Sequence, residues 1–152
     1  MIPKEFFVTS GKAVSRVSEL NAFDLALKEA GIAQYNIVEV SSVLPPNCKE
    51  VEPRTMPVGS IIYAVMARMD GKGGETISAG IAWTYEENGS YGIVAEAHGY
   101  IDEKEIQKAL KHRIEEMARA RGIRTGTIKY RIEGMKVPSG KYGCTIAALI
   151  YL

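Results

Sequence analysis

The sequence predicts an α+β fold in which largely antiparallel strands form the sheet layers and two helices cover them. Segments with the alternation or β-branched enrichment of strands outnumber the amphipathic segments. A run of strands also separates the two amphipathic segments, which argues against alternating βαβ units. With 152 residues, 46% of them hydrophobic, the chain has the size and apolar content of one ordinary domain. We therefore expect a single domain over residues 1–152.

The N-terminal part is expected to hold a strand and a short helix. Aromatic and β-branched side chains make residues 5–9 a strand candidate, and residues 10–19 are expected to form a loop. Asn21, with the acid Asp24 three positions on, is typical of a helix start, and Gly31 is typical of a helix end.

The middle of the chain is predicted to be rich in strands. A strand over residues 35–44 should end at Pro45 because proline cannot donate a hydrogen bond to a neighbouring strand. The apolar residues 60–70 and the segments 76–85 and 91–100 predict further strands. An Asn-Gly pair between the last two segments favours a hairpin. We expect these last three strands to form an antiparallel meander.

The C-terminal part combines the clearest helix with two strands. Asp102 and Glu105 form a capping box, and apolar residues recur at helical spacing as far as Gly122. Residues 128–133 alternate apolar and charged side chains, which is the period of a half-buried strand. Residues 144–152 are apolar throughout and are expected to form a central strand.

Charge and hydropathy exclude several classes of protein. Nineteen Lys and Arg against 18 Asp and Glu give a formal net charge of +1, so no broad basic field indicates nucleic-acid binding. No apolar run reaches the roughly 20 residues that cross a bilayer, and the N-terminus lacks the pattern of a signal peptide. We expect a cytoplasmic protein that binds neither nucleic acid nor a membrane. Cys48 and Cys144 lie far apart, which argues against a disulfide or a metal site.

Glu96 is the first candidate for chemistry. It lies in the predicted strand 91–100 among small and apolar neighbours, where loss of hydration would raise the pKa of its carboxyl group. A carboxyl group with a raised pKa can act as a general acid near neutral pH. His98 shares this face of the strand, so the two residues form either a catalytic pair or a polar rim.

Ser41 and Ser42 are the second candidate. Two serines at the end of an apolar strand can simply cap that strand end. The pair also permits self-cleavage, in which the Ser42 hydroxyl attacks the Ser41 carbonyl and the acyl group moves from nitrogen to oxygen. β-Elimination then releases the upstream chain and leaves dehydroalanine, which hydrolyses to a pyruvoyl group. The ketone of that group forms a Schiff base with an amino acid and acts as an electron sink in place of PLP.

Several sequence blocks, in order along nearly the whole chain, resemble the landmarks of the pyruvoyl-dependent arginine decarboxylases. They are residues 20–24, 30–32, 41–46 and 74–78, together with Asn36 and Glu96. The resemblance implies a four-layer αββα sandwich. It also implies a homotrimer of αβ protomers, or a higher multiple, with active sites between neighbouring subunits.

The resemblance also implies roles for individual residues. Cleavage before Ser42 would give a β chain of residues 1–41 and an α chain of residues 42–152. Ser42 would become the pyruvoyl cofactor, without PLP and without a metal. Asn36 matches an asparagine implicated in processing, where its amide could donate to the oxyanion of the acyl shift. Glu96 matches the glutamate that protonates the substrate carbon after carbon dioxide leaves.

The implied substrate is L-arginine, which would be converted to agmatine and carbon dioxide for polyamine synthesis. Asp24 matches the aspartate that receives the guanidinium group, although an acid there could instead serve as a favourable charge at the start of a helix. Leu20, Tyr35 and Val43 would line the pocket. Ala33 stands where the family has a glycine, which leaves open the same chemistry on another amino acid. An uncut, non-catalytic trimeric binding protein is the third alternative.

Overall fold

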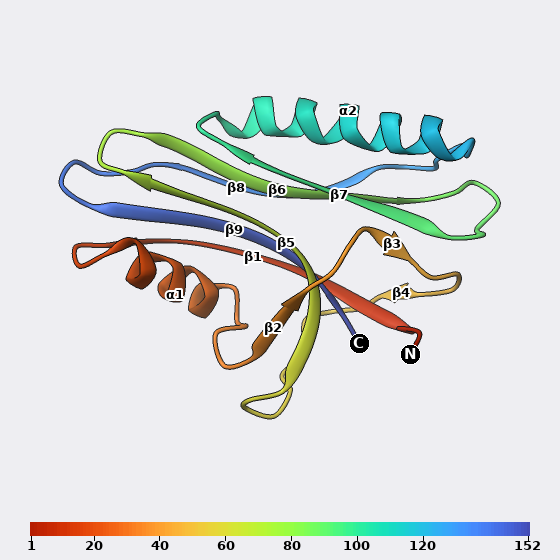
Figure 1. The fold of residues 1–152 in the computed structure, drawn as a ribbon, viewed down its shortest axis with the longest axis horizontal. Helices are drawn as coiled ribbons and strands as arrows, with labels where there is room; N and C mark the ends of the chain where they lie inside the picture. Colours follow the sequence, from red (N-terminus) through yellow and green to blue (C-terminus); the bar gives the residue numbers. More distant parts are fainter.

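The fold is a stack of two β-sheets with one helix on each outer face (Figure 1). The computed structural model describes all residues 1–152. The layers run from α1 through a five-stranded and a four-stranded sheet to α2, which confirms the α+β sandwich. The elements are β1 (Glu5–Ser15), α1 (Glu19–Glu29), β2 (Asn36–Glu39), β3 (Val43–Leu44), β4 (Lys49–Glu50), β5 (Ile61–Lys72), β6 (Thr76–Tyr85), β7 (Gly92–Gly99), α2 (Glu103–Arg121), β8 (Lys129–Lys136) and β9 (Tyr142–Tyr151).

β9 lies in the middle of the five-stranded sheet, whose order is β2-β5-β9-β1-β4. It pairs antiparallel with β5 on one side and with β1 on the other. Both of its faces are buried, which explains why its sequence is apolar throughout and confirms the predicted central strand. Only the short edge strands β2 and β4 run parallel to their neighbours.

The four-stranded sheet has the order β3-β7-β6-β8, with every pair antiparallel. The predicted hairpin between β6 and β7 is confirmed, and Gly89 in its turn takes the positive φ of 72° that glycine favours. The predicted meander of three strands is wrong, because β5 belongs to the other sheet. Residues 73–75, between the end of β5 and the start of β6, therefore carry the chain from one sheet to the other.

Three hydrophobic cores hold the layers together. The central core lies between the sheets, while α1 and α2 each cover a separate core on an outer face. Burying one large aliphatic side chain contributes about 1.5–3 kcal/mol, so each interface is strongly favoured. The fully buried members include Phe6 and Leu149 between the sheets, Ile146 under α1, and Ile106 and Leu110 on the inner face of α2.

β1 is longer than the sequence indicates, and the loop expected over residues 10–19 is wrong for residues as far as Ser15. β1 stays paired with β9 until Ser15 lies opposite Tyr142. Small residues occur in this stretch because α1 packs closely against it: a Cβ atom added at Gly11 would lie 2.3 Å from the carbonyl oxygen of Ala26. Gly11 therefore marks a close contact with a helix.

α1 begins earlier than predicted, since Ser18 is its N-cap. The extended Ser18 accepts a hydrogen bond at its Oγ from the Asn21 N–H, at 3.1 Å. The prediction of Asn21 as the cap is wrong because Ser18, three residues upstream, already satisfies the first free N–H groups. Asp24 consequently lies in the second turn, where the helix dipole no longer favours an acid strongly.

α2 matches the sequence prediction at both ends. Asp102 accepts a hydrogen bond from the Glu105 N–H at 2.9 Å, and Gly122 ends the helix in the left-handed conformation. Its apolar stripe packs on the four-stranded sheet. No helix in the structure combines the length and the apolar character needed to cross a membrane.

Candidate active site

The segment over residues 35–44 is two strands, so the prediction of one continuous strand is wrong. β2 pairs with β5 in the five-stranded sheet, whereas β3 pairs with β7 in the four-stranded sheet. The residues between them, Val40, Ser41 and Ser42, cross from one sheet to the other, as the path from β2 to β3 in Figure 1 shows. The two halves of the segment pair with strands of different sheets, and a local sequence pattern does not specify pairing partners.

One hydrogen bond from each sheet flanks the Ser41–Ser42 peptide. The Val40 N–H donates to the Ala64 carbonyl oxygen at 2.9 Å, in the five-stranded sheet. The Ser42 carbonyl oxygen accepts from the Val94 N–H, also at 2.9 Å, in the four-stranded sheet. The peptide is therefore anchored at both ends. Ser41 is exposed and Ser42 is half-buried.

Glu96 points toward the same crossing because of the alternation of β7. Ala95 and Ala97 pack in the core under α2, while Val94 packs in the core between the sheets. Glu96, which alternates with Ala95 and Ala97, lies on the side of the sheet that faces the other sheet. β3 is only two residues long, so the outer edge of β7, opposite β6, has no strand beside it at Glu96 and the side chain reaches an opening.

A cavity of about 440 Å³ brings Ser41, Ser42 and Glu96 together. The crossing segment, β5, β7 and α2 all contribute to its wall. Its other lining residues are Val40, Val65, Val94, Ala95, His112, Arg113, Glu116 and Met117. The structure thus unites the proposed cleavage pair and the proposed general acid in one place.

The surroundings of Glu96 raise the pKa of its carboxyl group above the ordinary value. Partial loss of hydration at the cavity is the larger cause, although the side chain remains exposed overall in the protomer, and the negative charge of Glu39 on β2 adds to it. The positive charges of His98 and Arg113 act in the opposite direction and lower the pKa. The balance favours the protonated carboxyl at a higher pH than in water, as a general acid requires. The raised pKa that the sequence predicted for Glu96 is confirmed.

The structure places Leu20, Asp24 and Tyr35 away from this cavity. Leu20 and Asp24 are exposed on α1, which covers the outer face of the five-stranded sheet, and Leu20 is 71% exposed. Tyr35 is buried in the core under α1, where its hydroxyl oxygen accepts a hydrogen bond from the Met56 N–H at 2.9 Å. None of the three residues lines the cavity of its own protomer.

Asn36 and Val43 lie on either side of the crossing segment. Asn36 begins β2, and its side-chain amide donates to the Gly59 carbonyl oxygen at 2.9 Å. Val43 begins β3 and lines a second cavity, of about 360 Å³, that also includes Ser41. Ser41 is therefore accessible from both cavities.

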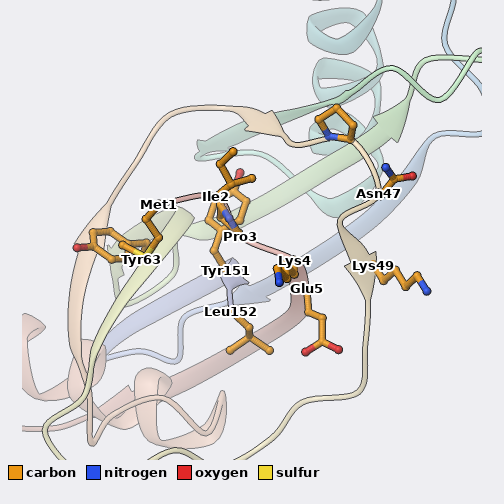
Figure 2. A pocket seen from close by; sticks show the side chains of 11 residues that line it. Met1, Ile2, Pro3, Lys4, Glu5, Asn47, Lys49, Tyr63, Tyr151 and Leu152 are labelled. Atoms are coloured by element: carbon orange, nitrogen blue, oxygen red, sulfur yellow. The ribbon is translucent and has the colours of Figure 1, made fainter.

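The second cavity adjoins a larger pocket, of about 990 Å³. The two share Met1, Pro3, Tyr63 and Tyr151. Figure 2 shows the N-terminal residues crossing this pocket, with Tyr63 and Asn47 on opposite sides of the view. Met1 is fully exposed and Tyr63 is 37% exposed, so an apolar surface extends from Ser41 to the chain ends.

Glu39 and Arg113 are the site residues that sequence reasoning missed. Glu39 lies three residues before Ser42, and nothing in that spacing shows that its charge reaches Glu96. Arg113 lies on α2, 17 residues beyond Glu96, and meets it only through the packing of α2 on β7. No cluster of three or more His, Cys, Asp or Glu side chains in the structure could hold a metal ion.

Comparison with known proteins identifies the family. The family model of pyruvoyl-dependent arginine decarboxylase matches residues 5–152. The chain belongs to this family. It is 34% identical over 150 residues to a pyruvoyl-dependent arginine decarboxylase of Methanopyrus kandleri, covering 99% of this chain and 97% of that protein. It is also 33% identical over 115 residues to one of Pyrococcus abyssi, covering 74% and 73%. The predicted family is confirmed.

A solved structure of a pyruvoyl-dependent histidine decarboxylase at pH 8 has a related fold. It superposes with a TM-score of 0.52 at 14% identity, covering 64% of this chain and 52% of that one. At this identity the likeness concerns the fold alone. It agrees with the two-sheet sandwich derived above.

Proposed function

We propose that this chain is a self-processing decarboxylase that converts L-arginine to agmatine and carbon dioxide, as its family membership implies. The observation that carries the proposal is the cavity that joins Ser41 and Ser42 to Glu96. A residue pair able to cut the chain and a carboxyl group with a raised pKa are both required for pyruvoyl-dependent chemistry. The cytoplasm is its proposed compartment, since Cys48 and Cys144 are free thiols.

The anchored crossing segment supports cleavage between Ser41 and Ser42. With Val40 fixed to one sheet and the Ser42 carbonyl fixed to the other, the Ser42 hydroxyl has few ways to move relative to the Ser41 carbonyl carbon. Attack and elimination would leave a β chain of residues 1–41 and an α chain of residues 42–152. Asn36 holds the start of β2 through Gly59, so we propose that it aids processing by positioning this strand.

The lining of the cavity fits a pyruvoyl group at position 42. Ser42 is half-buried, apolar residues such as Val65 and Val94 line the same cavity, and its volume of about 440 Å³ has space for an amino-acid substrate. The group would supply a ketone carbonyl that withdraws electrons from the substrate carbon. Glu96 would give its proton to that carbon after carbon dioxide leaves. The valine side chains that line the cavity, Val40, Val65 and Val94, disfavour a charged carboxylate beside them, which promotes its loss.

Recognition of arginine is proposed to depend on a neighbouring subunit. Asp24 has the charge to receive a guanidinium group, and Leu20 is an apolar neighbour on the same helix. Because neither residue lines the cavity of its own protomer, we propose a homotrimer, or a higher multiple, in which α1 of one protomer faces the Ser42 cavity of the next. Exposed apolar side chains near the crossing segment, such as Val38, Val43 and Ile61, support such an assembly.

Denaturing electrophoresis, intact-mass measurement and an agmatine assay test this proposal together. We expect two fragments produced by cleavage between Ser41 and Ser42, and formation of agmatine and carbon dioxide from arginine. Two fragments with turnover of a different amino acid would keep the mechanism and change the substrate. A single uncut species of 16.6 kDa under all conditions would favour the alternative hypothesis of a non-catalytic binding protein.

A further inference from the structure

Arg113 is a charged residue in the cavity wall to which the proposed reaction assigns no role. Its guanidinium donates a hydrogen bond through Nη1 to the main-chain carbonyl oxygen of Glu96, at 2.5 Å. Arg113 takes part in no ion pair, whereas Lys111 and Arg119 on the same helix each pair with a glutamate. A guanidinium group has five N–H donors, so most of its hydrogen-bonding capacity remains available inside the cavity.

The contact lies at the outer edge of β7, on the side away from β6, where no strand pairs with Glu96. β3 pairs only with Gly92 and Ile93, and the crossing segment reaches only Val94 through the Ser42 carbonyl. Beyond that point the outer edge of β7 is open, and an unpaired strand edge is free to shift. Arg113 gives the Glu96 carbonyl a hydrogen-bond partner at this open edge. This hydrogen bond fixes the backbone of Glu96, and with it the direction of the side chain that must reach the substrate.

The charges around Glu96 come from three elements. Glu39 on β2 favours protonation of the Glu96 carboxyl, while His98 on β7 and Arg113 on α2 oppose it. His112 and Glu116 on α2 also line the cavity. Arg113 is the permanently charged cation in this set, because arginine stays protonated at every pH at which proteins are folded.

We propose that Arg113 is a positioning residue for Glu96: it fixes the open edge of β7 at the Glu96 carbonyl and supplies the positive charge that the Glu96 carboxyl faces. This role deepens the proposed function and rests on it for its catalytic meaning. It concerns the chain before and after cleavage alike, since Arg113 contacts neither Ser41 nor Ser42 by a hydrogen bond. The proposal assigns Arg113 no contact with the substrate, so its role is that of a positioning residue and not of a catalytic one.

The test is a direct titration of Glu96 by NMR in the uncut Ser42→Ala chain, with glutamate carboxyl carbons labelled. Comparison with Ser42→Ala/Glu96→Gln assigns the Glu96 signal. Adding Arg113→Met should move its titration midpoint to higher pH, because a positive charge is lost. Adding Arg113→Lys should keep the midpoint close to that of the parent chain. Arg121→Met, at the far end of α2, is the matched control and should leave the midpoint unchanged.

A second readout uses the cleaved enzyme. In the processed Arg113→Met variant, the fall of kcat at alkaline pH should move to higher pH along with the NMR midpoint, since Glu96 keeps its proton longer. An unchanged NMR midpoint in Arg113→Met, or an equal change in Arg121→Met, would overturn the role of Arg113. The NMR result does not depend on processing or on the substrate, so it separates failure of this inference from failure of the proposed function.

Discussion

Glu96 and Asp24 are the two carboxylates on which the proposed activity depends, and the fold places only Glu96 at the Ser42 cavity, although both side chains are exposed in the protomer. Glu96 lies on a strand at the cavity of Ser42, where partial loss of hydration and Glu39 raise its pKa. Asp24 lies on the exposed side of α1, beyond the five-stranded sheet. In the proposed mechanism the groups for cleavage and proton transfer come from one protomer, while the group for substrate selection would be supplied by a neighbouring protomer.

The difference follows from the elements that carry the two residues. Glu96 is held by a β7 backbone that pairs with β6 on one side and meets Arg113 on the other, so its direction is fixed by the sheet. Asp24 is fixed only by its helix, and its carboxylate forms no ion pair in the protomer. Changes at Glu96 should alter the reaction itself. Changes at Asp24 should alter which substrate is accepted.

The largest expected effect is at the cavity itself, for Ser42→Ala. The substitution removes the attacking oxygen and keeps the backbone hydrogen bond to Val94, so a folded, uncut chain with no decarboxylase activity is expected. Denaturing electrophoresis measures the cleavage. Ser41→Ala is the matched control and should still be cut, because the carbonyl under attack remains. Cleavage of Ser42→Ala would place the cofactor elsewhere in the chain.

Glu96→Gln should separate processing from turnover. The amide keeps the shape of the side chain but cannot supply the proton, so kcat should fall by about 10²- to 10⁴-fold in a chain that is still cut. Steady-state kinetics on the cleaved variant measure this loss. Glu115→Gln, on the exposed side of α2, is the control. Near-normal decarboxylation by cleaved Glu96→Gln would remove Glu96 from the mechanism.

The raised pKa of Glu96 also makes the free energy of unfolding depend on pH, because the folded state disfavours the ionised carboxylate. A carboxyl group with a raised pKa in the folded state binds its proton more tightly there than in the unfolded chain. Its contribution to stability is therefore lost as pH rises from the ordinary glutamate pKa through the raised value. In wild type, kcat should fall over the upper part of this range. Glu96→Gln should melt no lower than wild type at neutral pH in a thermal scan, whereas a large drop would show that the charged carboxylate stabilises the fold.

Asp24→Asn tests the proposed role of Asp24 in substrate selection. If Asp24 receives the guanidinium group, kcat/KM for arginine should fall by roughly 10- to 100-fold, as expected for a charge-assisted hydrogen bond of about 1.5–3 kcal/mol. Chain cleavage and thermal stability should stay near wild type. The loss should be smaller for uncharged citrulline. Equal losses for both substrates would favour a different amino acid as the natural substrate, and Glu29→Gln on the same helix is the control.

Local signals in the sequence predicted the parts of the fold that depend on local chemistry. The Asp102 cap, the Gly122 stop and the hairpin at Gly89 each follow from residues within a few positions of one another. β9 was predictable because a strand buried on both faces needs an apolar sequence throughout. The sheet to which β5 belongs was not predictable, since a glycine-rich turn serves equally well within a sheet and between sheets.

The candidate site was predictable in part for the same reason. Ser41, Ser42 and Glu96 each carry their own chemical signal, and the structure brings them together. The contact between Arg113 and Glu96 carries no such signal, because it depends on where α2 lies on β7. The separation of Asp24 from the cavity was equally hidden, since helix position relative to a sheet is a tertiary property. Residues that act on the site through tertiary packing can therefore be identified only from the structure.

The smallest expected effect compares the caps of the two helices. Ser18→Ala and Asp102→Ala each remove one side-chain acceptor from a helix start and should cost about 0.5–2 kcal/mol of stability. Thermal scans should show similar decreases in Tm, of about 2–4 °C for each kcal/mol. The kinetic effects should differ. The first turn of α1 contains Leu20, so fraying there should raise KM for arginine while cleavage proceeds.

Asp102→Ala should leave KM for arginine unchanged, because the first turn of α2 lies far along the helix from Arg113 and the cavity. The two variants lose similar amounts of stability, one on each helix. A difference in KM between them therefore reports only whether the position of α1 affects substrate binding. Equal KM values in both variants would show that α1 does not approach the substrate, even if Asp24→Asn lowers activity. A higher KM in Ser18→Ala alone would place the N-terminal turn of α1 beside the bound substrate, as the subunit arrangement proposed here requires.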